Sequence, residues 1–244
     1  MTGRNAFVMF VAGLCLMALT SPEEAAVHAQ PADRPRLTVK PGPDFEVTGK
    51  GDHAAWSQVE WTALRRRQAD GHPYDTRFKV LYSTTGLYFL MDGTDKTQVA
   101  TMKEDFMDLW NEDVFEVFLW TDERHPVYFE YQISPLNREL AILVPNFGGQ
   151  FLGWRPWHYE DARKTRHSTK VIKDDKGTVT AWVGEFFIPY ALLKPLQNVP
   201  PKSGTTWRAN LYRIDYDEGQ SGWSWQPVQT NYHDIQRFGT IQFE

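Results

Sequence analysis

Short segments in which apolar and polar side chains alternate recur along the chain, and turn residues separate them about every ten positions. Neighbouring side chains of a strand point to opposite faces, so this alternation predicts strands. Arg77–Tyr82 and Leu87–Asp92 flank Ser83-Thr84-Thr85-Gly86 and predict a hairpin. Further predicted strands are Asp113–Trp120, Pro126–Ser134, Glu139–Val144, Ser168–Lys173, Thr178–Ile188, Thr206–Asp215 and Phe238–Phe243.

Helical patterns are few. Ala54–Leu64 gives a weak one, and Tyr190–Leu193, directly after Pro189, predicts one short turn. Many short, aromatic-rich strands with regular turns indicate an all-β protein, an antiparallel β-sandwich with two sheets in a jelly-roll or immunoglobulin-like arrangement. With 244 residues, 41% of them hydrophobic, and no internal repeat, we expect one sandwich domain over residues 44–244.

The N-terminal part has a different pattern. Arg4 precedes an apolar run from Ala6 to Leu19, and a polar stretch ends at Ala29, which predicts a secretory signal peptide over residues 1–29. The apolar run is shorter than the about 20 residues that a transmembrane helix needs, and no later segment is a candidate span. We therefore expect an exported protein, periplasmic or extracellular. Residues 30–43, rich in proline and charge, predict an N-terminal tether or a first edge strand.

Cysteine and charge exclude several classes of function. Cys15 is the only cysteine and lies inside the predicted leader, so the mature chain is expected to have no disulfide, thiolate nucleophile, thiolate zinc site or c-type haem attachment. The formal net charge of −5 argues against a nucleic-acid partner, which would normally bind a basic face.

Glu116 stands in the middle of an unusually apolar predicted strand. Val114, Phe118 and Trp120 share its face, and the opposite face is also largely apolar. A sandwich strand usually has one solvated face, so we expect a loop or a ligand to cover the second one. An ionised carboxylate is costly there without hydrogen bonds or a cation. Arg213 is one candidate partner, and a ligand is the other.

The next strand supplies polar groups. Tyr128, Glu130, Gln132 and Ser134 alternate along it, and this row would lie beside Glu116 if the two strands pair. Carboxylates, amides and aromatic rings together suit a sugar, whose hydroxyls need hydrogen-bond partners when buried and whose C–H faces stack on rings. A mono- or oligosaccharide is therefore the expected partner.

Tryptophans near these strands allow two interpretations each. Trp110 can be a core side chain or a binding platform. Trp154 and Trp157 lie in a loop and can form a hydrophobic lid or a binding wall. Trp223 and Trp225 alternate, so both can face the core.

Several motifs, in this order, resemble the family 9 carbohydrate-binding modules. The resemblance runs from about Val47 to Phe243 and is carried by TGKGDHAAW, RFKVLYSTTGLYFLMDGTD, LWNEDVFEVFLW, AWVGEFFIPYALL, WRANLYRID and HDIQRFGTIQF. LWNEDVFEVFLW matches the pattern W-x-x-D-x-x-E-x-F. The resemblance implies an exported, non-catalytic β-sandwich that binds a glucan or xylan-type sugar and serves polysaccharide breakdown or uptake.

The same resemblance implies the site. A sugar would lie between the rings of Trp110 and Tyr232, with hydroxyls held by Glu116 and Gln132. Beyond the resemblance, we expect Asn210 to join them as a further hydroxyl partner. Tyr232 stands where the family has a tryptophan, and Gln132 where an arginine is expected. Family members can hold structural calcium, but the sequence does not place its ligands.

Three alternatives remain open at this stage. A related sandwich superfamily binds b-type haem, and Met91, Met102 or Met107 with His72, His125 or His233 could supply axial ligands. A glycoside hydrolase would need two carboxylates, for which Glu116 with Glu130 or Asp113 are candidates. A sandwich without sugar affinity would serve protein assembly instead.

Overall fold

The computed structural model describes residues 35–68, 73–157, 160–217 and 219–244, so the predicted signal peptide and His72 lie outside the described residues. The strands are β1 (Arg36–Pro41), β2 (Thr62–Arg66), β3 (Thr76–Tyr82), β4 (Gly86–Thr94), β5 (Val114–Trp120), β6 (Val127–Ile133), β7 (Glu139–Phe147), β8 (Gln150–Phe151), β9 (Arg155–Pro156), β10 (Arg166–Lys173), β11 (Val179–Pro189), β12 (Thr206–Asp215), β13 (Ser221–Ser224) and β14 (Gly239–Phe243). The helices are single turns: η1 (Ala54–Gln58), η2 (Leu109–Asn111), η3 (Asp161–Arg163), α1 (Tyr190–Leu193) and η4 (Ile235–Arg237). None of these described helices is long enough to cross a bilayer.

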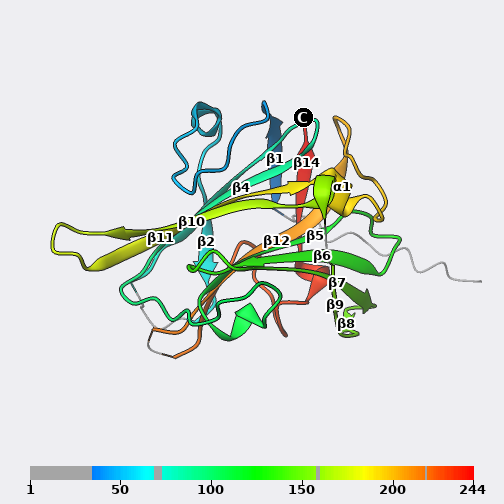
Figure 1. Ribbon diagram of the computed structural model, residues 1–244. Coiled ribbons are helices and arrows are strands. Elements are labelled where there is room, and N and C mark those ends of the chain that lie inside the picture. The colour runs from blue at the N-terminus through cyan, green and yellow to red at the C-terminus, as the bar shows by residue number, and fades with distance from the viewer. Residues whose placement is uncertain (1–34, 69–72, 158–159, 218) are drawn as a thin grey trace, which may run out of the picture. The chain divides into compact units, whose positions relative to one another are not determined.

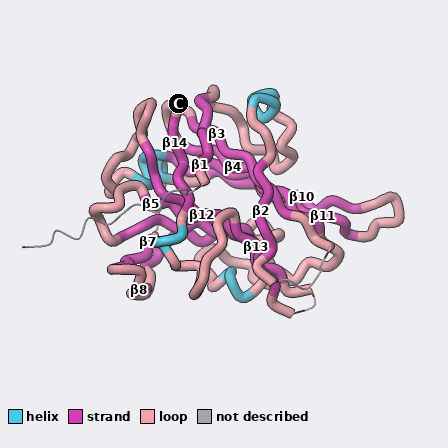
Figure 2. The backbone as a smooth tube through the Cα atoms, turned by 180° about the vertical axis from the view of Figure 1, so that it is seen from behind, coloured by secondary structure: helices cyan, strands magenta, loops and turns pink. Residues whose placement is uncertain are grey.

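Two sheets form the sandwich (Figure 1). In the first sheet β3, β4, β11 and β10 pair antiparallel in that order, and in the second β14, β12, β5, β6 and β7 do the same. Strand β1 joins the sheets, because its first four residues run parallel to β14 and its last two residues run parallel to β3. Strands β2 and β13 pair with each other between β3 and β12, which closes a ring of six strands (Figure 2).

Aromatic side chains fill the space between the two sheets. Phe115 of β5 stacks on Trp182 of β11 with ring centroids 3.7 Å apart, and Tyr131 of β6 lies 4.9 Å from Phe186 of β11. All four are buried. Gly184 lies within contact of Phe115, so the sheets approach closely at this point. Burial of these rings supplies much of the hydrophobic stabilisation.

The outer face of the first sheet is covered by the segment from Phe45 to Trp61. Glu185 of β11 points into this cover and is fully buried, yet it is well bonded. It accepts hydrogen bonds from the backbone of Thr48 and Gly49 and from Trp56 Nε1, each at 2.8 Å. The TGKGDHAAW motif is therefore the cover that satisfies the carboxylate of the AWVGEFFIPYALL motif.

The expected all-β sandwich is confirmed, and so are the predicted hairpin, which is β3–β4, and the turn at Tyr190–Leu193. The weak helix prediction over Ala54–Leu64 is wrong in its second half, because the chain forms the short helix η1 and then continues as strand β2. Within the expected tether, residues 30–43, the structure forms β1. Its residues 36–39 pair with β14 and its residues 40–41 pair with β3.

Candidate functional site

Both faces of β5 are buried, as its double apolar pattern predicts. Phe115, Val117 and Leu119 point into the core between the sheets, whereas Val114 and Phe118 belong to a second hydrophobic cluster on the outer face of the second sheet. Glu116 lies on this outer face with 2% of its surface exposed. The outer face therefore needs a cover, and loops provide it.

Three segments supply the cover. The single turn η2 places Trp110 at the start of β5, the loop between β8 and β9 brings Trp154, and the loop before η4 brings Tyr232. Trp110 and Trp154 meet edge to face, with ring centroids 5.6 Å apart. These loops leave a gap above Glu116.

The gap is a pocket of about 290 Å³. Apolar rings form most of its walls, and a few polar groups lie among them, which is the usual composition of a small-ligand site. Its lining residues are Trp110, Glu116, Phe118, Glu130, Gln132, Ile142, Phe151, Trp154, Ile214, Gln220, Tyr232 and His233.

Four of the five residues named from the sequence line this one pocket: Trp110, Glu116, Gln132 and Tyr232. The fifth, Asn210, does not line the pocket. Asn210 is fully buried, and its amide donates to Tyr212 Oη at 2.7 Å and to the Gln226 carbonyl at 3.0 Å. Its Oδ1 accepts from the backbone of Gln226 at 2.9 Å. Asn210 is a structural residue behind the pocket.

The pairing of β5 with β6 sets the polar groups of the pocket side by side. Glu116 lies opposite Gln132, and Phe118 lies opposite Glu130, so the polar row of β6 lies beside Glu116 as predicted. Gln132 Nε2 donates to Glu130 Oε1 at 2.6 Å. Three side-chain oxygens of this group are buried and have no hydrogen-bond partner among the described residues: Glu116 Oε2, Glu130 Oε2 and Gln132 Oε1.

Burial governs the protonation of the two carboxyl groups. It raises the pKa of Glu130 to about 8. Burial, and then the charge of Glu130, raise the pKa of Glu116 well above its usual value. A charged form loses its hydration in this pocket, and two adjacent charges repel each other. At neutral pH the pair therefore holds protons while it lacks a ligand.

His233 borders the same carboxylates but does not neutralise them. Its Nδ1 is hydrogen-bonded to Tyr128 Oη and lies 3.9 Å from Glu130 Oε2. Burial lowers the pKa of His233 to about 4, so the ring is neutral at pH 7. One of its faces stacks on Phe151, with ring centroids 4.1 Å apart.

Tyr232 is held by its neighbours. Its backbone carbonyl accepts a hydrogen bond from Tyr212 Oη at 2.7 Å, and the Tyr212 ring packs against it edge to face. The exposed Arg67 guanidinium lies 4.4 Å from the Tyr232 ring centroid, where a cation is attracted to the ring face. Asn210 acts in this arrangement by fixing Tyr212.

The alternative pairing of Glu116 with Arg213 is wrong, because adjacent positions of β12 point to opposite faces. Tyr212 lies opposite Glu116, whereas Arg213 points inward. Its Nη2 lies 2.6 Å from Asp215 Oδ2 and 3.4 Å from Asp95 Oδ2.

The structure also decides between the two interpretations of the other tryptophans. Trp154 forms a wall of the pocket, while Trp157, Trp223 and Trp225 pack in or against the core.

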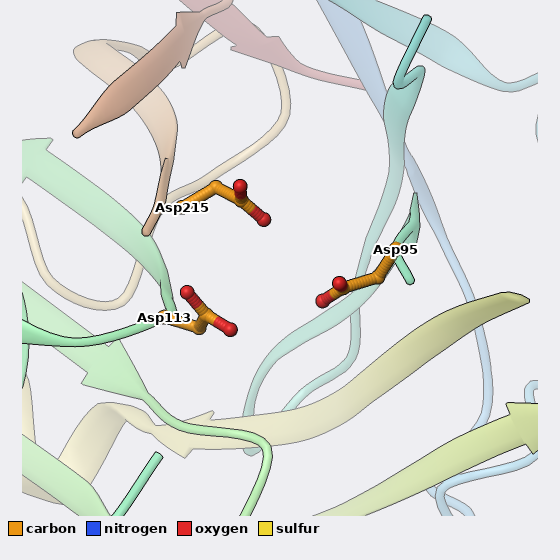
Figure 3. A group of neighbouring side chains, drawn as sticks. All are labelled: Asp95, Asp113 and Asp215. Atoms are coloured by element: carbon orange, nitrogen blue, oxygen red, sulfur yellow. The ribbon is translucent and has the colours of Figure 1, made fainter. Parts of the chain in front are cut away.

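Asp95, Asp113 and Asp215 form a second polar cluster, and their carboxyl groups point toward one another (Figure 3). Burial raises the pKa of Asp95 and of Asp113 to about 7, although the charge of Arg213 opposes the shift at Asp95. Carboxylate oxygens are the ligands that Ca²⁺ prefers. Asp95, Asp113 and Asp215 are therefore the residues that would hold a calcium ion in this fold, with Arg213 beside them.

The haem alternative has no support near His233, because none of the described residues that line its pocket is a methionine. Met91 is buried between the sheets, Met102 packs against the second hydrophobic cluster, and Met107 is 40% exposed. His72 lies outside the described residues.

For the hydrolase alternative, one of the two candidate carboxylate pairs lies in a single pocket, because Glu116 and Glu130 both line it. The other candidate, Asp113, belongs to the aspartate cluster.

The fold and the pocket define a small-ligand-binding β-sandwich. The chain belongs to the family described as carbohydrate family 9 binding domain-like, whose profile matches residues 47–244. This membership confirms the resemblance inferred from the motifs.

Solved structures share this fold at low sequence identity. A candidate carbohydrate-binding protein from Bacteroides uniformis is 16% identical, with a TM-score of 0.73, and the match covers 87% of this chain and 100% of that one. A family 9 module from Caldicellulosiruptor kristjanssonii in complex with cellotriose is 16% identical, with a TM-score of 0.62 and 86% and 94% covered. The same organism's module in complex with glucose is 16% identical, with a TM-score of 0.60 and 86% and 96% covered. No curated protein matches the chain.

Sequence reasoning left Trp154 open between a lid and a binding wall, and it did not assign His233, Phe151 or Glu130 to the sugar site. Trp154 and His233 reach the pocket from loops, where no periodicity tells which way a side chain points. Phe151 lies on the two-residue strand β8, which is too short to give a pattern. The signal for Glu130 was present, since it belongs to the same polar row of β6 as Gln132.

Proposed function

We propose that this chain is an exported, non-catalytic module that binds a mono- or oligosaccharide in the pocket above Glu116. The observation that carries the proposal is the convergence of Trp110, Tyr232, Glu116 and Gln132 on one pocket, although they come from four separate segments. Aromatic rings offer stacking surfaces for the C–H faces of a sugar, and carboxyl and amide groups match its hydroxyls.

The sugar class follows from the relatives. Structures of the Caldicellulosiruptor module contain glucose and cellotriose, so a glucose-type ring is the first ligand to test. In our proposal the ring lies between Trp110 and Tyr232, and Trp154 extends the wall on the Trp110 side. The predicted leader, residues 1–29, would deliver the module to the periplasm or the cell exterior, where polysaccharide is degraded or taken up.

The two carboxyl groups favour binding over catalysis. Hydrolysis of a glycosidic bond needs one protonated acid and one ionised carboxylate. Burial raises the pKa of both Glu116 and Glu130, so the pocket lacks an ionised partner near neutral pH.

Calorimetric titration of the mature chain with glucose and cellotriose tests the proposal. We expect saturable binding with one ligand per chain and no release of shorter sugars from cellotriose. Absence of any heat with either sugar, from a chain that circular dichroism shows to be folded, would refute sugar binding. Release of glucose would instead support the hydrolase.

A further inference from the structure

The floor of the pocket presents polar side-chain oxygens that no described residue bonds. Glu116 Oε2, Glu130 Oε2 and Gln132 Oε1 are each buried and unpartnered. All three residues are 2% exposed or less, so the oxygens do not obtain their hydrogen bonds from bulk solvent. A buried acceptor without a partner costs about 1–3 kcal/mol. A ligand that donates to all three would remove that cost.

The pocket also lacks a cation of its own. Among the described residues that line it, none is a lysine or an arginine, and His233 is neutral at pH 7. Arg67 is exposed and lies over the Tyr232 ring, and Arg213 points to the opposite face of the sheet. Two carboxyl groups that share one buried site stay ionised only if a positive charge joins them.

On the basis of the proposed sugar binding, we propose that the pocket prefers a sugar that carries a primary amine, such as a 2-amino-2-deoxyhexose or an oligomer of it. An ammonium group presents three donors and no acceptor, which matches the three unpartnered oxygens of Glu116, Glu130 and Gln132. Hydrogen bonds from a charged donor to a carboxylate are roughly twice as strong as neutral ones. The sugar ring would still stack on Trp110.

Proton release accompanies this mode of binding. The empty pair of Glu116 and Glu130 holds protons near neutral pH, and the entering ammonium replaces a proton, which leaves to the buffer. Affinity for the amine therefore rises with pH between about 5 and 7, by up to about tenfold per pH unit for one released proton. Above about pH 8 the amine itself loses its charge and affinity falls. The groups that face the pair are Tyr128 of β6, Tyr212 of β12, Tyr216 after β12, and Tyr232 and His233 before η4. Arg67, after β2, lies over the Tyr232 ring and not against the pair.

Calorimetry with three monosaccharides tests the preference on the mature chain. We expect D-glucosamine at pH 7 to bind about tenfold tighter than D-glucose and N-acetyl-D-glucosamine, as one additional charge-assisted hydrogen bond would give. N-acetylation is the informative control because it keeps the nitrogen and removes its charge. Equal or weaker binding of glucosamine, with glucose still bound, would overturn the amine preference and leave sugar binding intact. No binding of any of the three would overturn both.

A variant without the Glu130 charge tests whether the preference for the amine depends on this carboxylate. In Glu130→Gln the ratio of glucosamine to glucose affinity should fall to about one, whereas Glu104→Gln, which removes an exposed carboxylate outside the pocket, should keep the wild-type ratio. A ratio that survives Glu130→Gln contradicts the proposal. If that variant does not fold, the pH series on the wild-type chain decides, since a flat profile for glucosamine between pH 5 and 7 rules the mechanism out.

Discussion

Trp110 and Trp154 meet edge to face, with ring centroids 5.6 Å apart, and together they form one wall of the pocket. Trp110 comes from the turn before β5 and Trp154 from the loop after β8. Each ring limits the movement of the other, which keeps the wall in place before a ligand arrives. Preorganisation of this kind lowers the entropic cost of binding.

Replacing Trp110 with alanine should weaken glucose binding about tenfold and leave the fold intact. The ring is only partly buried, and a stacking contact is worth about 1 kcal/mol. Calorimetry gives the affinity, and near-ultraviolet circular dichroism reports the fold. Trp61→Ala is the matched control, because Trp61 is also partly buried but lies in the cover of the first sheet. Unfolding of Trp110→Ala alone would show that Trp110 is a core residue.

Stability should decrease as pH rises from 5 to 8. Glu130 has a folded-state pKa of about 8 against a usual value of 4.5, and Glu116 shifts in the same direction. In this window the folded state binds more protons than the unfolded state, so the free energy of unfolding falls with pH. Thermal melts of the ligand-free chain at several pH values measure this dependence. In Glu130→Gln the melting temperature should change less with pH. An unchanged pH dependence in that variant would argue that Glu130 is not the group responsible.

Calcium should raise the melting temperature. Asp95 and Asp113 have pKa values near 7 and share one positive charge, Arg213, with Asp215, so a bound divalent cation would relieve their repulsion. A ligand that binds only the folded state at 100 times its Kd adds about 2.7 kcal/mol. Melts in millimolar calcium, and again after addition of a chelator, test this. The calcium-dependent rise in melting temperature should disappear in Asp95→Asn. A rise of wild-type size in that variant would mean that the ion binds elsewhere.

The bond between Trp56 and Glu185 should contribute to stability and not to sugar affinity. Trp56→Phe keeps most of the buried ring and removes the donor at 2.8 Å, which should cost about 1–3 kcal/mol. Urea denaturation gives the free energy of unfolding. Glucose titration should be unchanged, because the two residues lie on the outer face of the first sheet, away from the pocket. A loss of affinity without a loss of stability would contradict this division.

The sequence alone determined the architecture and most of the pocket's polar groups. Strand periodicity is a local property, so the alternation in β5 and β6 was enough to place Glu116 and Gln132 on one face of paired strands. The resemblance of the motifs to family 9 modules then implied Trp110 and Tyr232. The same periodicity showed that the second face of β5 needs a cover, which the structure confirms.

Only the tertiary structure decided what the cover is and which polar groups it leaves unpaired. Trp154 and His233 reach the pocket through loops, whose course depends on contacts between distant segments. Asn210 has the right residue type on the right face of β12, but its hydrogen bonds are taken by Tyr212 and Gln226. Whether a buried polar group is free to bind a ligand depends on its neighbours in space, and sequence order does not fix them.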